Sequence, residues 1–204
     1  FQKIDHTLLN LTHQITYLSL GIIYILQGTK MAEFYYYDET SDLPYTEDHN
    51  SGKVVTEKQL ADLGVFYRHV ETEEGVNKIA KERNYKNRDV ISLSEETFPG
   101  GKEALSKQLD KFFEEHLHED EEIRYILDGE GYFDVRDSND RWIRAKIFKH
   151  DLLILPPGIF HRFTLSSTKY IKALRLFKDR PKWEAHFRST PETEDNIYRK
   201  NYLK

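Results

Sequence analysis

The chain has 204 residues, enough for one domain with a substantial core, and carries 32% charged residues with a formal net charge of -5. This mildly acidic charge, without any basic cluster, argues against a nucleic-acid partner. Because the sequence contains no cysteine, disulfides, thiolate metal ligands and a cysteine nucleophile are excluded, which fits a reducing compartment.

Residues 1–30 differ from the rest of the chain. Their apolar run at 18–26 is too short to span a bilayer as a helix, which takes about 20 apolar residues, so we expect no membrane association. The run loosely resembles a signal peptide, but no convincing small-x-small cleavage site lies near Gly28. Met31 is the sole methionine, and Phe1 is not an ordinary start. We therefore interpret 1–30 as an extension that does not belong to the domain that follows, either translated upstream sequence or part of another exon. A genuine targeting extension is the alternative.

From residue 31 onward, strand and helix patterns alternate. We predict a strand at 32–37, a polar loop at 38–53, a helix at 56–64, a strand at 65–70, a helix at 73–84, a strand at 88–93 and a helix at 102–113. Thr56 to Gln59 form a capping box that opens the first helix, and Gly64 closes it. Leu105, Leu109 and Phe112 give the third helix one apolar face.

The second half of the chain has the pattern of short β-strands. We predict strands at 122–127, 131–136, 141–148, 152–155, 161–165 and 170–177. The segments 137–140 and 149–151 have the composition of hairpin connections. Short strands with tight turns indicate an antiparallel sandwich or barrel. The tail from Asp179 is polar, with Trp183 and Phe187 as expected packing residues.

Four side chains in this region have the types and spacing of a metal site. Residues i and i+2 of a strand point to the same face, so His116 and His118 aim two imidazoles the same way. Glu122 keeps this parity if the strand stays regular, and a returning strand can bring His161 beside them. This mixed nitrogen and oxygen set favours Fe, Ni, Mn, Co or Zn over Ca or Mg. The alternative is a chance His-x-His beside a solvated acidic run at 119–122.

The joint pattern resembles the two cupin motifs, G-x5-H-x-H-x3,4-E-x6-G and G-x5-P-x-G-x2-H-x3-N. The matching residues are His116, His118, Glu122, Gly129, Pro156, Gly158 and His161. The sequence departs from the pattern at Asp110, His150 and Leu165, which are turn or backbone positions, and we interpret His150 as an exposed turn residue. Gly129 and Gly131 lie where the strand must turn. We therefore expect a mainly β cupin, a double-stranded β-helix or jelly-roll barrel, with a few flanking α-helices.

More of the chain resembles one particular family, the acireductone dioxygenases. The similar segments are 63–65, 82–85, 113–118, 120–129, 131–137, 142–144, 155–164 and 173–177. The resemblance runs from Met31 to about Arg188, so we expect one cupin domain at 31–204. It implies one Fe(II) or Ni(II) per monomer, with acireductone and O2 as small-molecule partners in methionine salvage. With iron the implied products are formate and the 2-oxo acid precursor of methionine; with nickel they are formate, carbon monoxide and methylthiopropionate.

The resemblance also assigns roles to residues around the metal. Arg124 matches a catalytic arginine that stabilises the bound ene-diolate, and it shares a strand face with Glu122. Arg175 matches a second arginine near the substrate, and Phe112 and Phe163 match substrate-binding aromatics of the pocket wall. The alternatives are a solvated charge for Arg124, a structural salt bridge for Arg175 and ordinary core packing for the two phenylalanines.

Other functions of a cupin remain open at this point. One alternative is another metal-dependent cupin enzyme, such as an isomerase or a different dioxygenase. Another is a non-enzymatic cupin that binds a protein partner. From the resemblance we expect a monomer with a cytoplasmic location, and a nuclear one as well.

Overall fold

The computed structural model describes residues 30–180 and 184–204. The contacts within the chain divide it into two compact units, Phe1–Lys30 and Met31–Lys204, and the second unit holds all the elements described below. The interpretation of 1–30 and the packing role expected for Trp183 lie outside the described residues. Within the described ranges, no helix is long and apolar enough to cross a membrane.

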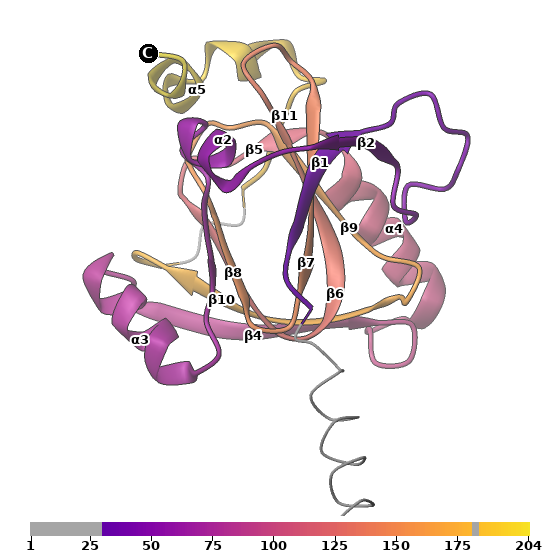
Figure 1. The fold of residues 1–204 in the computed structure, drawn as a ribbon, viewed down its shortest axis with the longest axis vertical. Coiled ribbons are helices and arrows are strands. Elements are labelled where there is room, and N and C mark those ends of the chain that lie inside the picture. Colours follow the sequence, from indigo (N-terminus) through magenta and orange to yellow (C-terminus); the bar gives the residue numbers. More distant parts are fainter. Residues whose placement is uncertain (1–29, 181–183) are drawn as a thin grey trace, which may run out of the picture. The chain divides into compact units, whose positions relative to one another are not determined.

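The second unit is a barrel of two antiparallel sheets with helices on its outside (Figure 1). Its strands are β1 (Glu33–Tyr37), β2 (Asn50–Val54), β3 (Phe66–His69), β4 (Asn87–Ser94), β5 (His116–Leu117), β6 (Glu122–Arg136), β7 (Trp142–Phe148), β8 (Asp151–Leu155), β9 (His161–Leu165), β10 (Tyr170–Phe177) and β11 (His186–Phe187). The helices are α2 (Glu57–Asp62), α3 (Glu73–Glu82), α4 (Gly101–Phe113), the 3-10 helix η1 (Pro191–Asp195) and α5 (Ile197–Tyr202). The predicted mainly β fold is confirmed.

The two sheets share one long strand, β6. The first sheet has the order β11-β5-β9-β6-β7-β1-β2, and the second has the order β3-β8-β6-β10-β4. Residues 122–129 of β6 pair in the second sheet, and residues 130–136 pair in the first. The strands predicted at 122–127 and 131–136 are therefore one strand that crosses between sheets, and the chain does not turn back at the glycines.

A bulge and a glycine produce the bend in β6. The register of β6 against β10 slips between Ile126 and Asp128, which leaves Leu127 as the extra residue of a β-bulge. Gly129 follows with φ +76°, and a Cβ there would collide with the backbone of Tyr170 on β10. Only glycine fits both conditions, so the glycine of the cupin motif is required by the crossing of the strand.

Residues 149–151 do not form the predicted hairpin, because β7 and β8 belong to different sheets. His150 makes this crossing with φ +76°, the left-handed conformation for which the cupin motif uses glycine. Its side chain is half-buried, with Nδ1 3.0 Å from the Tyr125 hydroxyl, so the expectation of an exposed residue is wrong. The hairpin at 137–140 is confirmed, since it joins the paired strands β6 and β7.

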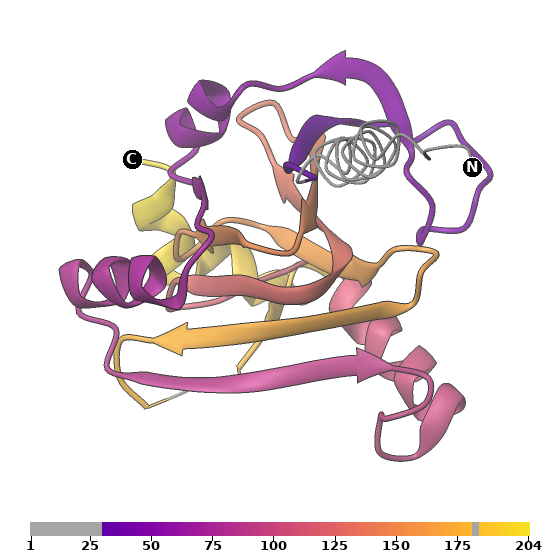
Figure 2. The same ribbon diagram turned by 60° about the horizontal axis from the view of Figure 1, so that its bottom comes forward.

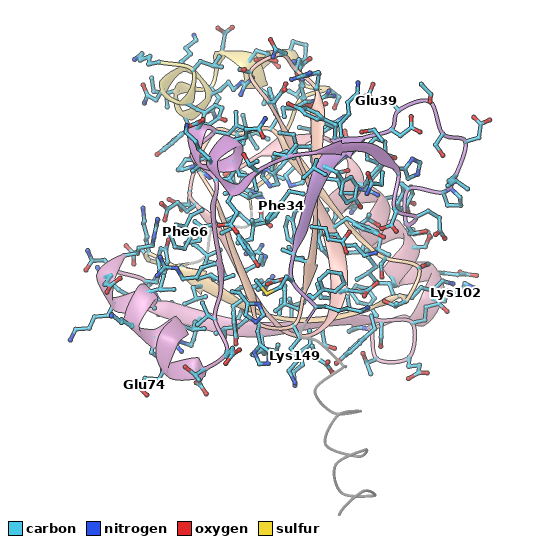
Figure 3. All side chains as sticks on the ribbon, in the orientation of Figure 1. Phe34, Glu39, Phe66, Glu74, Lys102 and Lys149 are labelled. Atoms are coloured by element: carbon cyan, nitrogen blue, oxygen red, sulfur yellow. The ribbon has the colours of Figure 1, made fainter. Side chains whose placement is uncertain are left out.

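One apolar core fills the space between the sheets, and helix α3 packs a second apolar cluster onto the outer face of the second sheet. Phe34 of β1 points into this core, whereas Glu74 of α3 and Lys102 of α4 lie at the periphery (Figure 3). Helix α4 buries Leu105 and Leu109 and half-buries Phe112, as its predicted apolar face requires. This position brings the end of α4 next to the strands that carry the site.

The predicted capping box is present. Thr56 accepts a hydrogen bond from the backbone N–H of Gln59, and the Gln59 side chain accepts one from the backbone N–H of Thr56. The predicted loop at 38–53 extends too far. Its last residues belong to β2, an exposed edge strand that pairs with β1. The polar tail from Asp179, for which no elements were predicted, contains β11, η1 and α5.

Candidate metal centre

The structure brings the four predicted ligands together. One ligand atom from each of His116, His118, Glu122 and His161 lies within 4.8 Å of all the others. His116 belongs to β5, His118 follows it, and Glu122 and His161 are the first residues of β6 and β9. His116, Glu122 and His161 are buried and His118 is half-buried. The cluster therefore lies inside the barrel, near one end of its strands.

Strand pairing holds His116 and His161 next to each other with their rings tilted by 59°. They are direct partners in the register of β5 and β9, and their ring centroids lie 4.5 Å apart. Glu122 reaches the cluster by a different route from the one predicted. Strand β5 ends at Leu117 and β6 starts anew at Glu122, where it pairs with Leu155 of β8, so uninterrupted strand parity does not apply.

Each imidazole is oriented by a hydrogen bond on its outer nitrogen. Nδ1 donates to a backbone carbonyl in all three cases: His116 to Glu114 at 2.6 Å, His118 to Glu184 at 2.7 Å and His161 to Ile159 at 3.0 Å. A proton on Nδ1 leaves the lone pair of a neutral imidazole on Nε2, which is the atom facing the cluster. Such outer hydrogen bonds are the usual support of a metal-binding histidine.

Glu122 divides its two carboxylate oxygens between the histidines and an arginine. Oε2 lies 3.1 Å from Nε2 of His161 and 3.2 Å from Nε2 of His118. Oε1 lies 3.1 Å from the guanidinium of Arg124. The neighbouring Glu121 faces elsewhere, since it accepts a hydrogen bond from the Tyr85 hydroxyl at 2.7 Å.

The electrostatics of the cluster favour a bound cation. Burial, reinforced by nearby His161, lowers the pKa of His116 to about 3, so that imidazole stays neutral. Burial acts to raise the pKa of Glu122, but Arg124 and two imidazoles outweigh it and hold that pKa well below its usual range. Burial acts to lower the pKa of His118, but its contacts with Glu122 raise it. A carboxylate and imidazole nitrogens are the forms that bind a divalent transition metal, so the residues fit one.

A cavity of about 440 Å³ opens onto these four residues. Its wall is mainly apolar and includes Leu93, Phe112, Ile126, Phe133, Phe163 and Ile171. Phe112 and Phe163 meet edge to face with ring centroids 6.1 Å apart, and both also pack against the core. Phe112 and Phe163 therefore both line the pocket and pack against the core.

Two arginines place positive charge beside this apolar wall. Arg124 lines the cavity with a side chain that is only 18% exposed, which is not the position of a solvated strand charge. Arg175 also lines the cavity, and Asp89 holds it by two contacts of 2.7 and 2.8 Å. Arg175 is thus both a cavity residue and a partner in a structural salt bridge.

Two residues of this site were not assigned to it from the sequence. Asp89 was placed on the correct strand, but nothing in its neighbourhood marked it as the partner of Arg175. Phe187 was expected to pack, and it does so at the cavity wall, with its ring centroid 5.9 Å from that of His116. It comes from β11, in the tail that was described from the sequence only as polar. The pairing of β11 with β5 places Phe187 directly opposite His116.

An antiparallel barrel that holds three histidines and one glutamate around the mouth of an apolar cavity defines a metal-binding cupin. Comparison with known proteins narrows this class. A model of the ARD/ARD' family matches residues 33–185. The chain belongs to this family.

Similar curated proteins agree with this assignment. The chain is 56% identical over 162 residues to acireductone dioxygenase of Candida albicans, covering 78% of this chain and 91% of the relative. It is 53% identical over 172 residues to acireductone dioxygenase of Yarrowia lipolytica, covering 84% and 97%. The predicted family and an enzyme of the dioxygenase class are confirmed.

A solved structure supports the fold. The acireductone dioxygenase from Bacillus anthracis, with a cadmium ion in its active centre, superimposes with a TM-score of 0.62 at 23% identity. The match covers 78% of this chain and all of that chain. The predicted cupin fold is confirmed.

Proposed function

We propose that this protein cleaves acireductone with O2 and uses one Fe(II) or Ni(II) per monomer, held by His116, His118, Glu122 and His161. The observation that carries the proposal is the convergence of these side chains at a cavity that also contains Arg124. Three imidazoles and one carboxylate would hold such an ion and leave room for a chelating substrate. Such an ion supplies Lewis acidity and a template for the ene-diolate.

Arg124 is the residue that we assign to charge stabilisation. Its guanidinium is anchored by the backbone carbonyl of Ile123 at 3.0 Å and by Oε1 of Glu122. Because the side chain is mostly buried, its charge acts across a medium of low dielectric and is worth more than in water. A preorganised cation of this kind stabilises the negative charge of the ene-diolate as it redistributes during the reaction.

The apolar wall selects and shields the rest of the substrate. Phe112 and Phe163 provide ring faces and edges to the methylthio tail, and we assign both to substrate binding. Arg175, held by Asp89, adds a second positive charge near the anionic head of the substrate. The same wall excludes bulk water from the reacting atoms, which strengthens the electrostatic contribution of Arg124.

The products follow from the resemblance to the family. With iron we expect formate and the 2-oxo acid precursor of methionine, the reaction that serves methionine salvage. With nickel we expect formate, carbon monoxide and methylthiopropionate. We further propose that the protein works as a monomer in the cytoplasm and also occurs in the nucleus.

The experiment that tests the activity is the measurement of O2 uptake with freshly generated acireductone and metal-reconstituted protein. Stoichiometric O2 consumption with release of formate supports the proposal. Conversion of the substrate without O2 consumption would point to an isomerase, the alternative among metal-dependent cupin enzymes. The variant Arg124→Ala, loaded with the same metal, is the matched control. A reaction that takes place in this cavity should be slower in this variant.

A further inference from the structure

The cavity floor is formed by three neighbouring strands, β4, β10 and β6, whose residues lie in rows across the sheet. Figure 2 shows β4 and β10 side by side. From the metal end outward, the first row contains Asp89, Arg175 and Arg124, the second contains Ile91, Ala173 and Ile126, and the third contains Leu93, Ile171 and Gly129. Within a row the residues are direct cross-strand partners, so their side chains are neighbours.

Each row contributes side chains to the cavity, and on β6 the bulge changes which residues do so. Arg175, Ala173 and Ile171 alternate along β10 and share one face. On β6 the even-numbered Ile126 lines the cavity before the bulge, and the odd-numbered Phe133 lines it afterwards. The floor therefore changes along its length from a charged row to two apolar rows.

Ala173 is the small residue at the centre of this apolar floor. It is 4% exposed and lies directly between Ile91 on β4 and Ile126 on β6. Directly opposed Cβ atoms lie about 5 Å apart, so two branched side chains flank a single methyl group. Because Ala173 is smaller than both neighbours, this row is lowest over its methyl group, and we call that strip the tail groove. Phe163 and Phe112 line the same cavity.

The position of this groove matches the reach of a short chain from the charged row. Ala173 lies two residues from Arg175, about 7 Å along β10 at about 3.4 Å per residue. A substrate whose anionic head lies at the first row would extend a tail of a few atoms over Ala173. Because the walls of the groove are formed by Ile91 and Ile126, an unbranched tail fits and a branched tail meets their methyl groups.

We propose that Ala173 is a specificity-determining residue that sets the width of the tail groove, admitting an unbranched thioether tail and excluding branched ones. The proposal deepens the proposed function and rests on it for the identity of the substrate. Ala173 lies in a different row from the charged residues Arg175 and Arg124. Enlarging residue 173 should therefore change discrimination between tails and leave the anionic head in place.

The experiment compares Ala173→Leu with wild-type holoenzyme on two acireductones, one with the methylthio tail and one with a single methyl in its place. We expect the ratio of kcat/KM for the long over the short substrate to fall at least about 10-fold, since each methylene accommodated in an apolar pocket is worth roughly 10-fold to 200-fold. Ser92→Leu is the matched control. Ser92 is exposed on β4 between Ile91 and Leu93, on the opposite face of the sheet, and its variant should keep the wild-type ratio.

A second variant removes bulk from the groove. Ile91→Ala should raise kcat/KM for an acireductone with a branched tail relative to the methylthio substrate. If Ala173→Leu yields no folded protein, Ala173→Val and Ile91→Ala still decide the question. An unchanged ratio in the folded variants, or equal losses with both substrates, would overturn the assignment.

Binding separates this inference from the proposed function. Anaerobic titration calorimetry of the holoproteins with both acireductones measures the ratio of Kd values without turnover. If wild-type protein consumes no O2 with either substrate, the proposed function fails, while a Kd ratio that shifts in Ala173→Leu and not in Ser92→Leu still supports the groove. If O2 is consumed and the Kd ratio does not shift, the groove is wrong and the function stands.

Discussion

The guanidinium of Arg124 lies 3.1 Å from Oε1 of Glu122, while the other oxygen of that carboxylate faces two imidazoles. The two residues are two positions apart on β6, so their side chains share one strand face. One oxygen is thus directed towards the proposed metal position, and the other fixes the arginine that lines the cavity. This contact links metal binding to the placement of the cationic group.

Glu122→Ala should sharply reduce metal retention. The substitution removes the one anionic ligand and leaves the charge of Arg124 unbalanced beside a divalent cation. Glu121→Ala is the control, because Glu121 contacts Tyr85 and Lys178 outside the cluster, and its effect should be mild. Metal-to-protein ratios from inductively coupled plasma mass spectrometry measure both. Equal losses in the two variants would refute the assignment of Glu122 as the ligand.

Arg124→Ala should keep its metal and lose turnover. Its proposed contribution is charge stabilisation in the reaction, and removal of one such group costs roughly 100-fold to 1,000-fold in rate. Arg124→Lys retains the charge but not the planar guanidinium, so it should recover only part of the rate. Steady-state O2 uptake at verified metal content measures the effect. Near-normal turnover in Arg124→Ala would remove this residue from the mechanism.

One polypeptide should give two product patterns. The site offers no thiolate and one carboxylate, so ligand type discriminates little between Fe(II) and Ni(II), although the intrinsic affinity order favours nickel. A single batch of metal-free protein, divided and reloaded with each metal, should yield the 2-oxo acid with iron and carbon monoxide with nickel. Gas and liquid chromatography of both samples measure the products. Identical products from both would show that the family's dual chemistry does not extend to this chain.

Much of the site could be predicted because its ligands lie in short sequence motifs. The spacing of His116 and His118 defines a shared direction, and a turn motif precedes His161. The periodicity of apolar residues along the sequence predicted most of the elements between residues 33 and 177. The family resemblance then added roles to Arg124 and the phenylalanines.

The features that were not predicted depend on which strands pair with one another. A period of two identifies a strand but not its neighbour, so the crossing of β6 at Gly129 and the passage of His150 between sheets were not predicted. The same reason concealed the pairing of Asp89 with Arg175 and the approach of Phe187 to His116. Strand β2 was missed because its residues are polar and exposed, with hardly any apolar alternation.

Residues 1–30 should be dispensable for folding and catalysis. The family match begins at residue 33, and the described core and all four proposed ligands belong to the unit Met31–Lys204. A chain that starts at Met31 should yield soluble protein with full metal content and the same kcat/KM as the full chain. Circular dichroism, metal analysis and O2 uptake on both proteins check this. A large loss of solubility or activity would assign a structural role to the extension.

The metal-free protein should lose stability as the pH falls below about 6.5, with a contribution from His116. The folded-state pKa of this residue is lowered to about 3 by burial and by His161, whereas an unfolded chain takes up the proton near 6.5. Between these values the unfolded state binds more protons, so stability decreases as pH decreases, by at most about 1.4 kcal/mol per pH unit from one group.

The variant His116→Gln isolates this contribution, because it keeps a polar side chain that does not titrate. His118 and Glu122 remain in both proteins, and their own pH dependence largely cancels in the difference. In the presence of a chelator, wild type should lose stability relative to the variant as the pH is lowered from 6.5 to 4.5. Urea unfolding followed by circular dichroism at several pH values gives the two curves. If the two curves run parallel, the surroundings of His116 do not hold it neutral. The metal-free fold then does not preorganise a neutral imidazole at this position.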